Sequence, residues 1–189
     1  MDSLQKMYYD RYRARCDKGT RHTYIEVYEK LFRPYRDTAT DVIEIGVFKG
    51  GSIDLWTSYF TRATVHGVDV KPCVYAPEQP DRVRLYISDS ADGDRLHSAL
   101  EPGLMYDVII DDGCHKLNTQ KRTFTNLYPL LKPGGVYVIE DVTGGTPTIQ
   151  KLTSHCELAG ATVHVTDRRE IKRQQDDVLV ISVKPELVP

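Results

Sequence analysis

The chain has 189 residues, of which 40% are hydrophobic and 28% are charged, and its formal net charge is −2. This length predicts one domain with a full core, and the near-balanced charge argues against a nucleic-acid partner or a disordered chain. The sequence contains no apolar run of the roughly 18 residues that a membrane span needs, no signal-peptide pattern and no CxxC pair among its four cysteines. We therefore expect a cytoplasmic protein with free thiols and no membrane partner.

Residues 1–38 predict a helical N-terminal lead that covers the substrate and cofactor side of the molecule. Thr23 and Glu26 have the spacing of a capping box, so we expect Thr23 to cap a helix. The apolar side chains that follow recur at helical spacing: Tyr24, Tyr28, Leu31 and Tyr35. We expect this face to pack on the sheet edge, with exposed tyrosines available to a second copy in a possible homo-oligomer. The polar loop 17–22 ahead of the helix could fold over the active edge.

From residue 41 onward, short β-rich runs alternate with helical patterns, which indicates an α/β sheet domain over residues 39–189. We expect strands at Val42–Gly46, Thr64–Val68, Val83–Ile87, Val108–Ile110, Val136–Ile139, Ala161–Val165 and Val178–Val183. We expect helices near Gly51–Phe60, Gly93–Leu100, Leu117–Leu131 and Thr148–Leu158. The prediction is a Rossmann-like sheet of seven mostly parallel strands, with the last two strands forming a C-terminal antiparallel hairpin.

A glycine-rich loop follows the first strand and opens a helix. It contributes Glu44, Gly46, Gly50 and Ser52 as candidate cofactor residues. Phe48 stands where a dinucleotide-binding GxGxxG loop has glycine, which disfavours a nicotinamide dehydrogenase. The pattern ExGxxxG instead resembles the loop that binds S-adenosylmethionine (SAM) in class I methyltransferases. At the tip of the next strand, Asp69 would accept the ribose hydroxyls. After the third strand, the pair Asp89–Ser90 resembles the pair that meets the adenine in these methyltransferases.

Two acidic clusters follow neighbouring apolar runs, Asp111–Asp112 after one strand and Glu140–Asp141 after the next. Parallel strands bring their carboxyl ends to one edge of a sheet, so these carboxylates should converge. A shared cation or a shared proton makes such convergence tolerable. His115 follows Asp112 closely and should lie beside the same point.

With these motifs in place, the chain resembles the metal-dependent macrolide-sugar and rhamnosyl O-methyltransferases, through DKGTRHTY, EIGVFKGGS, GVDV, DDGCH and KPGGVYVIEDV. The resemblance implies a class I SAM-dependent methyltransferase domain that acts on a deoxysugar hydroxyl, for example of rhamnose in a glycan or glycoside. It implies Mg²⁺ (or Mn²⁺) held by Asp112, Glu140 and Asp141, with Asp112 and His115 as catalytic residues. It also implies that Lys18, Tyr24 and Asp111 face the cofactor.

Alternative interpretations remain open at this point. Asp112 could be only a helix N-cap, His115 could lie in the first turn of that helix, and Glu140–Asp141 could be a solvated strand end. The chain could also be a catechol-type O-methyltransferase or a SAM-binding module without activity. The segment 143–147 predicts a mobile lid near the metal. The remaining histidines show no supporting pattern and are interpreted as surface or packing residues: His22, His66, His97, His155 and His164.

Overall fold

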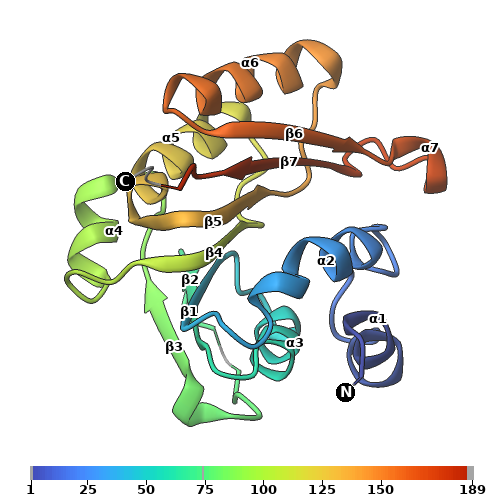
Figure 1. Ribbon diagram of the computed structural model, residues 1–189, viewed down its shortest axis with the longest axis vertical. Coiled ribbons are helices and arrows are strands. Elements are labelled where there is room, and N and C mark those ends of the chain that lie inside the picture. The colour runs from blue at the N-terminus through green and yellow to red at the C-terminus, as the bar shows by residue number, and fades with distance from the viewer. Residues whose placement is uncertain (1, 74, 187–189) are drawn as a thin grey trace.

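The computed structural model describes residues 2–73 and 75–186 as a seven-stranded sheet covered by helices on both faces (Figure 1). The strands are β1 (Asp41–Ile45), β2 (Thr64–Asp69), β3 (Val83–Ile87), β4 (Tyr106–Asp111), β5 (Leu131–Ile139), β6 (Thr162–Asp167) and β7 (Val178–Val183). Their order across the sheet is β3-β2-β1-β4-β5-β7-β6, and β7 pairs antiparallel with both β5 and β6. The predicted sheet with a C-terminal antiparallel hairpin is therefore confirmed.

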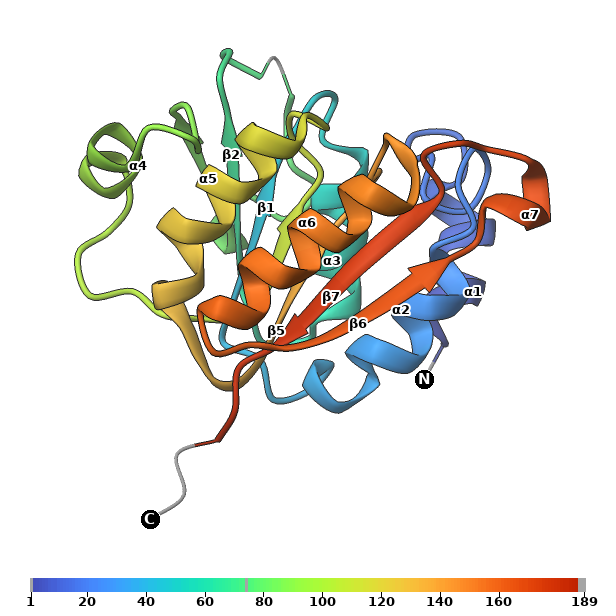
Figure 2. The same ribbon diagram turned by 90° about the horizontal axis from the view of Figure 1, so that it is seen from above.

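The helices divide between the two faces of the sheet (Figure 2). The longer ones are α2 (Ile25–Phe32), α3 (Gly51–Tyr59), α4 (Gly93–Ala99), α5 (Leu117–Leu127) and α6 (Gly145–Leu158). The shorter ones are α1 (Leu4–Met7), α7 (Arg169–Lys172), a π-helical turn at Tyr8–Tyr12 and 3₁₀ turns at Arg33–Tyr35, Pro80–Arg82 and Tyr128–Leu130. One core cluster joins α1, α2 and α3 to the sheet, and a second joins α4, α5 and α6 to the opposite face. No helix in the described part of the chain is long and apolar enough to cross a membrane.

Three predicted element boundaries were wrong by three residues or more: the end of α5 and the starts of β5 and α6. The helix expected to reach Leu131 ends at Leu127, because Pro129 lies in a 3₁₀ turn that cannot continue the α-helical ladder. Leu131 is instead the first residue of β5. Helix α6 begins at Gly145, three residues earlier than predicted, with Gly144 as its N-cap at φ +87°. Most of the segment expected to form a lid is therefore the first turn of a helix.

The predicted capping box at Thr23 was also wrong. Helix α2 begins at Ile25, and its N-cap Tyr24 makes no side-chain capping bond. Thr23 Oγ1 donates instead to Asp177 Oδ2 at 2.7 Å, and the Thr23 amide donates to Asp177 Oδ1 at 3.2 Å. Glu26 pairs with Arg168 at 2.9 Å. Thr23 and Glu26 therefore bind residues far away in the sequence, Asp177 and Arg168, instead of capping the helix.

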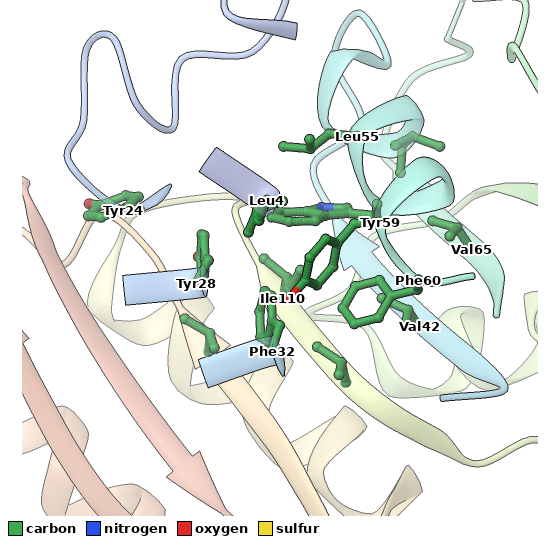
Figure 3. Packing of buried hydrophobic residues seen from close by; sticks show 14 of the residues in the cluster. Leu4, Tyr24, Tyr28, Phe32, Val42, Leu55, Tyr59, Phe60, Val65 and Ile110 are labelled. Carbon is green, nitrogen blue, oxygen red and sulfur yellow. The ribbon is translucent and has the colours of Figure 1, made fainter. Parts of the chain in front are cut away.

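Tyr24 and Tyr28 of the N-terminal segment lie in the core rather than on the surface. Tyr24 and Tyr28 are fully buried, and the Tyr28 ring stacks on Phe32 with centroids 4.7 Å apart. Figure 3 shows this aromatic cluster continuing to Tyr59 and Phe60 of the α3 region. The expectation of exposed tyrosines was therefore wrong for Tyr24 and Tyr28, and they offer no surface to a second subunit.

Asp107 ties the segment before β1 to β4 and β5. Its Oδ2 accepts from the amides of Thr40 (2.8 Å) and Asp41 (3.1 Å) and from Lys132 Nζ (2.8 Å). Burial alone would raise the pKa of Asp107, but these donors outweigh burial and hold it below its usual range. The carboxylate therefore stabilises the fold above the unfolded-state pKa of about 3.9, and this contribution is lost as the pH falls through the lower folded-state value.

We expect D107N to lower the free energy of unfolding by about 1–3 kcal/mol at neutral pH. The difference from the wild type should shrink as the pH falls below about 3.9 and disappear below the lower folded-state pKa of Asp107, where the wild-type carboxylate is itself protonated. Urea unfolding curves across this pH range measure both effects. A difference that stays constant down to the lowest pH would contradict the role of the ionised carboxylate.

Candidate functional site

A pocket of about 1020 Å³ opens at the carboxyl ends of the parallel strands. Its walls come from the loop after β1, the tips of β2 and β3, the loop after β4, and residues 13–21 of the N-terminal segment. Loops at this edge of an α/β sheet are where such folds bind ligands. The candidate residues that line the pocket are Lys18, Gly46, Ser52, Asp69, Asp89, Ser90, Asp112, His115 and Asp141.

The glycine loop makes a tight backbone turn at the pocket floor. Gly46 has φ +92°, and a Cβ there would lie 2.1 Å from the carbonyl oxygen of Asp112. Gly50 has φ +75° and is the N-cap of α3. Both positions therefore require glycine. Phe48 also has a positive φ (49°) and its side chain is 78% exposed at the pocket rim.

Asp69 fixes the other side of this loop. Its Oδ2 accepts from the amides of Val47 (3.0 Å) and Phe48 (3.1 Å), and its Oδ1 accepts from the amide of Lys71 (3.1 Å). The carboxylate thus holds the tip of β2 against the glycine loop. Ser90 Oγ lies 2.9 Å from Thr123 Oγ1, which ties the loop after β3 to α5.

Glu44 lies beneath the pocket rather than on its wall. It is fully buried and accepts from Ser52 Oγ (2.6 Å) and Trp56 Nε1 (3.2 Å). Burial raises the pKa of Glu44, and the nearby Lys18 ammonium opposes that rise.

Asp111 also lies outside the pocket wall, and burial raises its pKa to about 7. Among the described residues, Asp111 Oδ2 has no hydrogen-bond partner.

Lys18 is the centre of a buried acidic cluster. Its side chain is 1% exposed, and its Nζ lies 2.6 Å from Asp112 Oδ2, 2.7 Å from Glu140 Oε1 and 3.3 Å from Glu44 Oε1. Burial alone would lower the pKa of Lys18, but the three carboxylates outweigh burial and raise it. Tyr28 also donates to Glu140 Oε1, at 2.6 Å. Both of these donors bind Oε1 of Glu140, and Glu140 does not line the pocket.

Asp141 lies between the pocket and the N-terminal segment. Its φ is +53°, a conformation that costs free energy in a residue other than glycine. Tyr24 donates to its Oδ1 at 2.6 Å, and His115 Nε2 lies 3.7 Å from its Oδ2. Burial and the charge of Asp112 raise the pKa of Asp141, while Tyr24, His22 and His115 oppose the rise. The hydroxyl of Tyr24 is thus directed at Asp141, and Tyr24 does not line the pocket.

Asp112, His115 and Asp141 can bring one ligand atom each to within 4.8 Å of the others. All three line the pocket, and the His115 side chain is 39% exposed there. The carboxylate oxygens of Asp112 and Asp141 suit a divalent cation, and the His115 imidazole lies beside them. Glu140, predicted as a third ligand, belongs instead to a group with Glu44 and Asp112 around the Lys18 ammonium.

Three alternative interpretations of these residues were wrong. Helix α5 begins at Leu117 with Lys116 as its N-cap, so Asp112 is no cap and His115 is outside the first turn. The Glu140–Asp141 pair is not a solvated strand end, because the two residues are 1% and 7% exposed.

Sequence reasoning missed the role of two residues at this site, His22 and Tyr28. His22 was assigned to packing or the surface, yet its Nδ1 lies 3.4 Å from Asp141 Oδ1. Tyr28 was assigned to the core, where its ring does lie, but its hydroxyl binds Glu140. The only sequence feature that could have indicated a role for His22 at the site is its place beside Lys18 in the motif DKGTRHTY.

No family model matches the chain, but it is similar to several curated proteins. Over 133 residues it is 38% identical to 8-demethyl-8-alpha-L-rhamnosyl tetracenomycin-C 2'-O-methyltransferase of Streptomyces olivaceus, covering 67% of this chain and 35% of that protein. Over 132 residues it is 36% identical to mycinamicin VI 2''-O-methyltransferase of Micromonospora griseorubida, covering 66% and 32%. Over about two thirds of its length, the chain is similar to these sugar O-methyltransferases. It spans about a third of the length of the curated relatives that it matches.

A solved structure shares the fold over nearly the whole chain. It is the MycE methyltransferase from the mycinamycin biosynthetic pathway in complex with Mg, SAH and mycinamycin VI (SAH is S-adenosylhomocysteine). The TM-score is 0.75 at 24% identity, and the match covers 98% of this chain and 55% of that one. This likeness establishes the class I methyltransferase α/β fold for the chain.

Proposed function

We propose that the chain is a SAM- and divalent-metal-dependent O-methyltransferase that acts on a deoxysugar hydroxyl, for example of rhamnose in a glycan or glycoside. The observation that carries this proposal is the convergence of Asp112, His115 and Asp141 in the same pocket as the glycine loop. The names of the relatives support it, since they are O-methyltransferases of rhamnosyl and macrolide compounds. The presence of Mg and SAH in the MycE structures supports the choice of cofactors.

The pocket would hold SAM between the glycine loop and the tips of β2 and β3. Gly46 allows the backbone to approach the ligand closely, and Asp69 presents a carboxylate to the ribose. Asp89 and Ser90 lie where the adenine would reach. When bound, SAM supplies an activated methyl group, and the chain needs only to place the acceptor oxygen in line with it.

The acceptor side of the pocket is built for deprotonation of a hydroxyl. Asp112 and Asp141 would hold the cation, and Glu140 would join them only if the Lys18 ammonium moved away. When bound, Mg²⁺ makes a coordinated hydroxyl more acidic. His115 is placed to accept the proton, since histidine is the side chain best suited to proton transfer near neutral pH. Asp141, next to His115 Nε2 at 3.7 Å, would stabilise the protonated ring.

The test is SAH release from SAM with rhamnosides and with catechols, each in Mg²⁺ and in EDTA. We expect turnover on a rhamnoside that EDTA abolishes and that Mg²⁺ restores. Faster turnover on a catechol than on any rhamnoside would show that the acceptor is an aromatic diol and not a sugar. Tight SAH binding without turnover on any acceptor would favour a SAM-binding module.

A further inference from the structure

His22 is a buried imidazole that the proposed reaction does not use. It is 2% exposed, and neither ring nitrogen has a hydrogen-bond partner within the described residues. Buried polar side chains are almost always hydrogen-bonded, so an unpartnered imidazole needs an explanation. Histidine nitrogens and carboxylate oxygens are both zinc ligands in proteins.

The surroundings of His22 are acidic and well fixed. Its Nδ1 lies 3.4 Å from Asp141 Oδ1 and 3.7 Å from Asp177 Oδ1, and its Nε2 lies 4.0 Å from Asp17 Oδ2. The ring stacks on Tyr24 with centroids 4.9 Å apart. Its loop is also tied down by Lys172, whose Nζ donates to the carbonyl oxygens of Gly19, Thr20 and His22. The imidazole is therefore held in place before any ligand arrives.

His22, Asp141 and Asp176 can bring one ligand atom each to within 4.8 Å of the others. We propose that these three residues form a second divalent-cation site, beside the one proposed at Asp112 and Asp141. Asp141 is common to both sets, with Oδ1 toward His22 and Oδ2 toward His115. Its carboxylate would bridge two cations, as in two-metal sites.

The donor set indicates which cation the second site prefers. An imidazole nitrogen with carboxylate oxygens suits Zn²⁺ better than Mg²⁺, which favours oxygen ligands alone. Asp177 is an unsuitable ligand because both of its oxygens accept from Thr23. Two groups must yield to the cation. They are the Tyr24 hydroxyl on Asp141 Oδ1 and the Arg21 guanidinium, 59% exposed and 3.3 Å from Asp176 Oδ2.

The experiment is a calorimetric titration of Zn²⁺ into the protein in excess Mg²⁺, without SAM or sugar, followed by metal analysis after gel filtration. We expect H22Q to weaken Zn²⁺ binding by about 100-fold or more, since loss of an outer-shell partner alone costs 10–100-fold. D176N should weaken it as well. The matched control H164Q removes an exposed histidine and should leave binding unchanged, as should H115Q.

Absence of Zn²⁺ binding in the wild type would overturn the proposal. So would binding that H115Q abolishes and H22Q leaves intact, because the ion would then occupy the Asp112 set. If H22Q does not fold, D176N decides, since Asp176 lies at a partly exposed turn. The experiment measures metal stoichiometry rather than turnover. A protein without methyltransferase activity could therefore still bind Zn²⁺ at His22, and the two proposals can fail separately.

Discussion

Replacing Lys18 with methionine is expected to destabilise the protein by about 3–5 kcal/mol, because removing one partner of a buried ion pair leaves uncompensated charge. Three carboxylates, on Glu44, Asp112 and Glu140, would lose their common ammonium. The hydrophobic stem is largely retained in methionine, so the change tests the charge. Urea unfolding at neutral pH in EDTA measures the loss.

A divalent cation should partly rescue this variant. With the ammonium gone, the convergent carboxylates are free to bind Mg²⁺ or Mn²⁺, and such binding stabilises the folded state by mass action. The gain in melting temperature on adding Mn²⁺ should therefore be larger for K18M than for the wild type. K151M, which removes an exposed lysine of α6, is the matched control and should change neither stability nor the metal response. Stability of K18M equal to that of K151M would contradict the role of the buried ammonium.

Replacing His115 with glutamine is expected to lower kcat by about 10²–10⁴-fold, the usual contribution of a general base. Glutamine keeps a polar side chain at the pocket wall but cannot take up a proton near neutral pH. SAH binding should persist, since His115 lies on the acceptor side and not on the glycine loop. Turnover under saturating SAM and calorimetric titration of SAH measure the two quantities.

D112N should likewise abolish turnover while sparing SAH binding, because it removes a carboxylate from the proposed cation site. H164Q again serves as the control for His115 and should retain wild-type kcat. Loss of SAH binding in folded H115Q and D112N would instead place both residues in the cofactor site. Unchanged kcat in H115Q would exclude the imidazole as the base.

The parallel strands could be predicted because strands buried on both faces read as apolar runs, such as Val108–Ile110. The convergence of Asp112 and Asp141 followed from topology alone, since both follow the carboxyl ends of neighbouring strands. The end of α5 was misplaced because the apolar pattern continues through Leu131 as the chain passes from helix to strand.

The cluster around Lys18 could not be predicted in the same way. Lys18 is 94 residues from Asp112 and 122 residues from Glu140, and no local pattern records which side chains meet over such separations. The hydrogen bonds of Tyr24 and Tyr28 could not be predicted either. Helical spacing indicates which side chains share a face but not what their hydroxyl groups bind. Tyr24 and Tyr28 bury their rings in the core and direct their hydroxyls to Asp141 and Glu140.

The most direct measurement uses SAM with a deuterated methyl group and a panel of rhamnosides, in Mg²⁺ and in EDTA. Mass spectrometry and NMR would then locate the label on the product. We expect the labelled methyl group on one sugar oxygen, formed in Mg²⁺ and absent in EDTA. Label found on nitrogen or carbon, or on a sugar oxygen at the same rate in EDTA, would contradict metal-dependent transfer to a sugar hydroxyl.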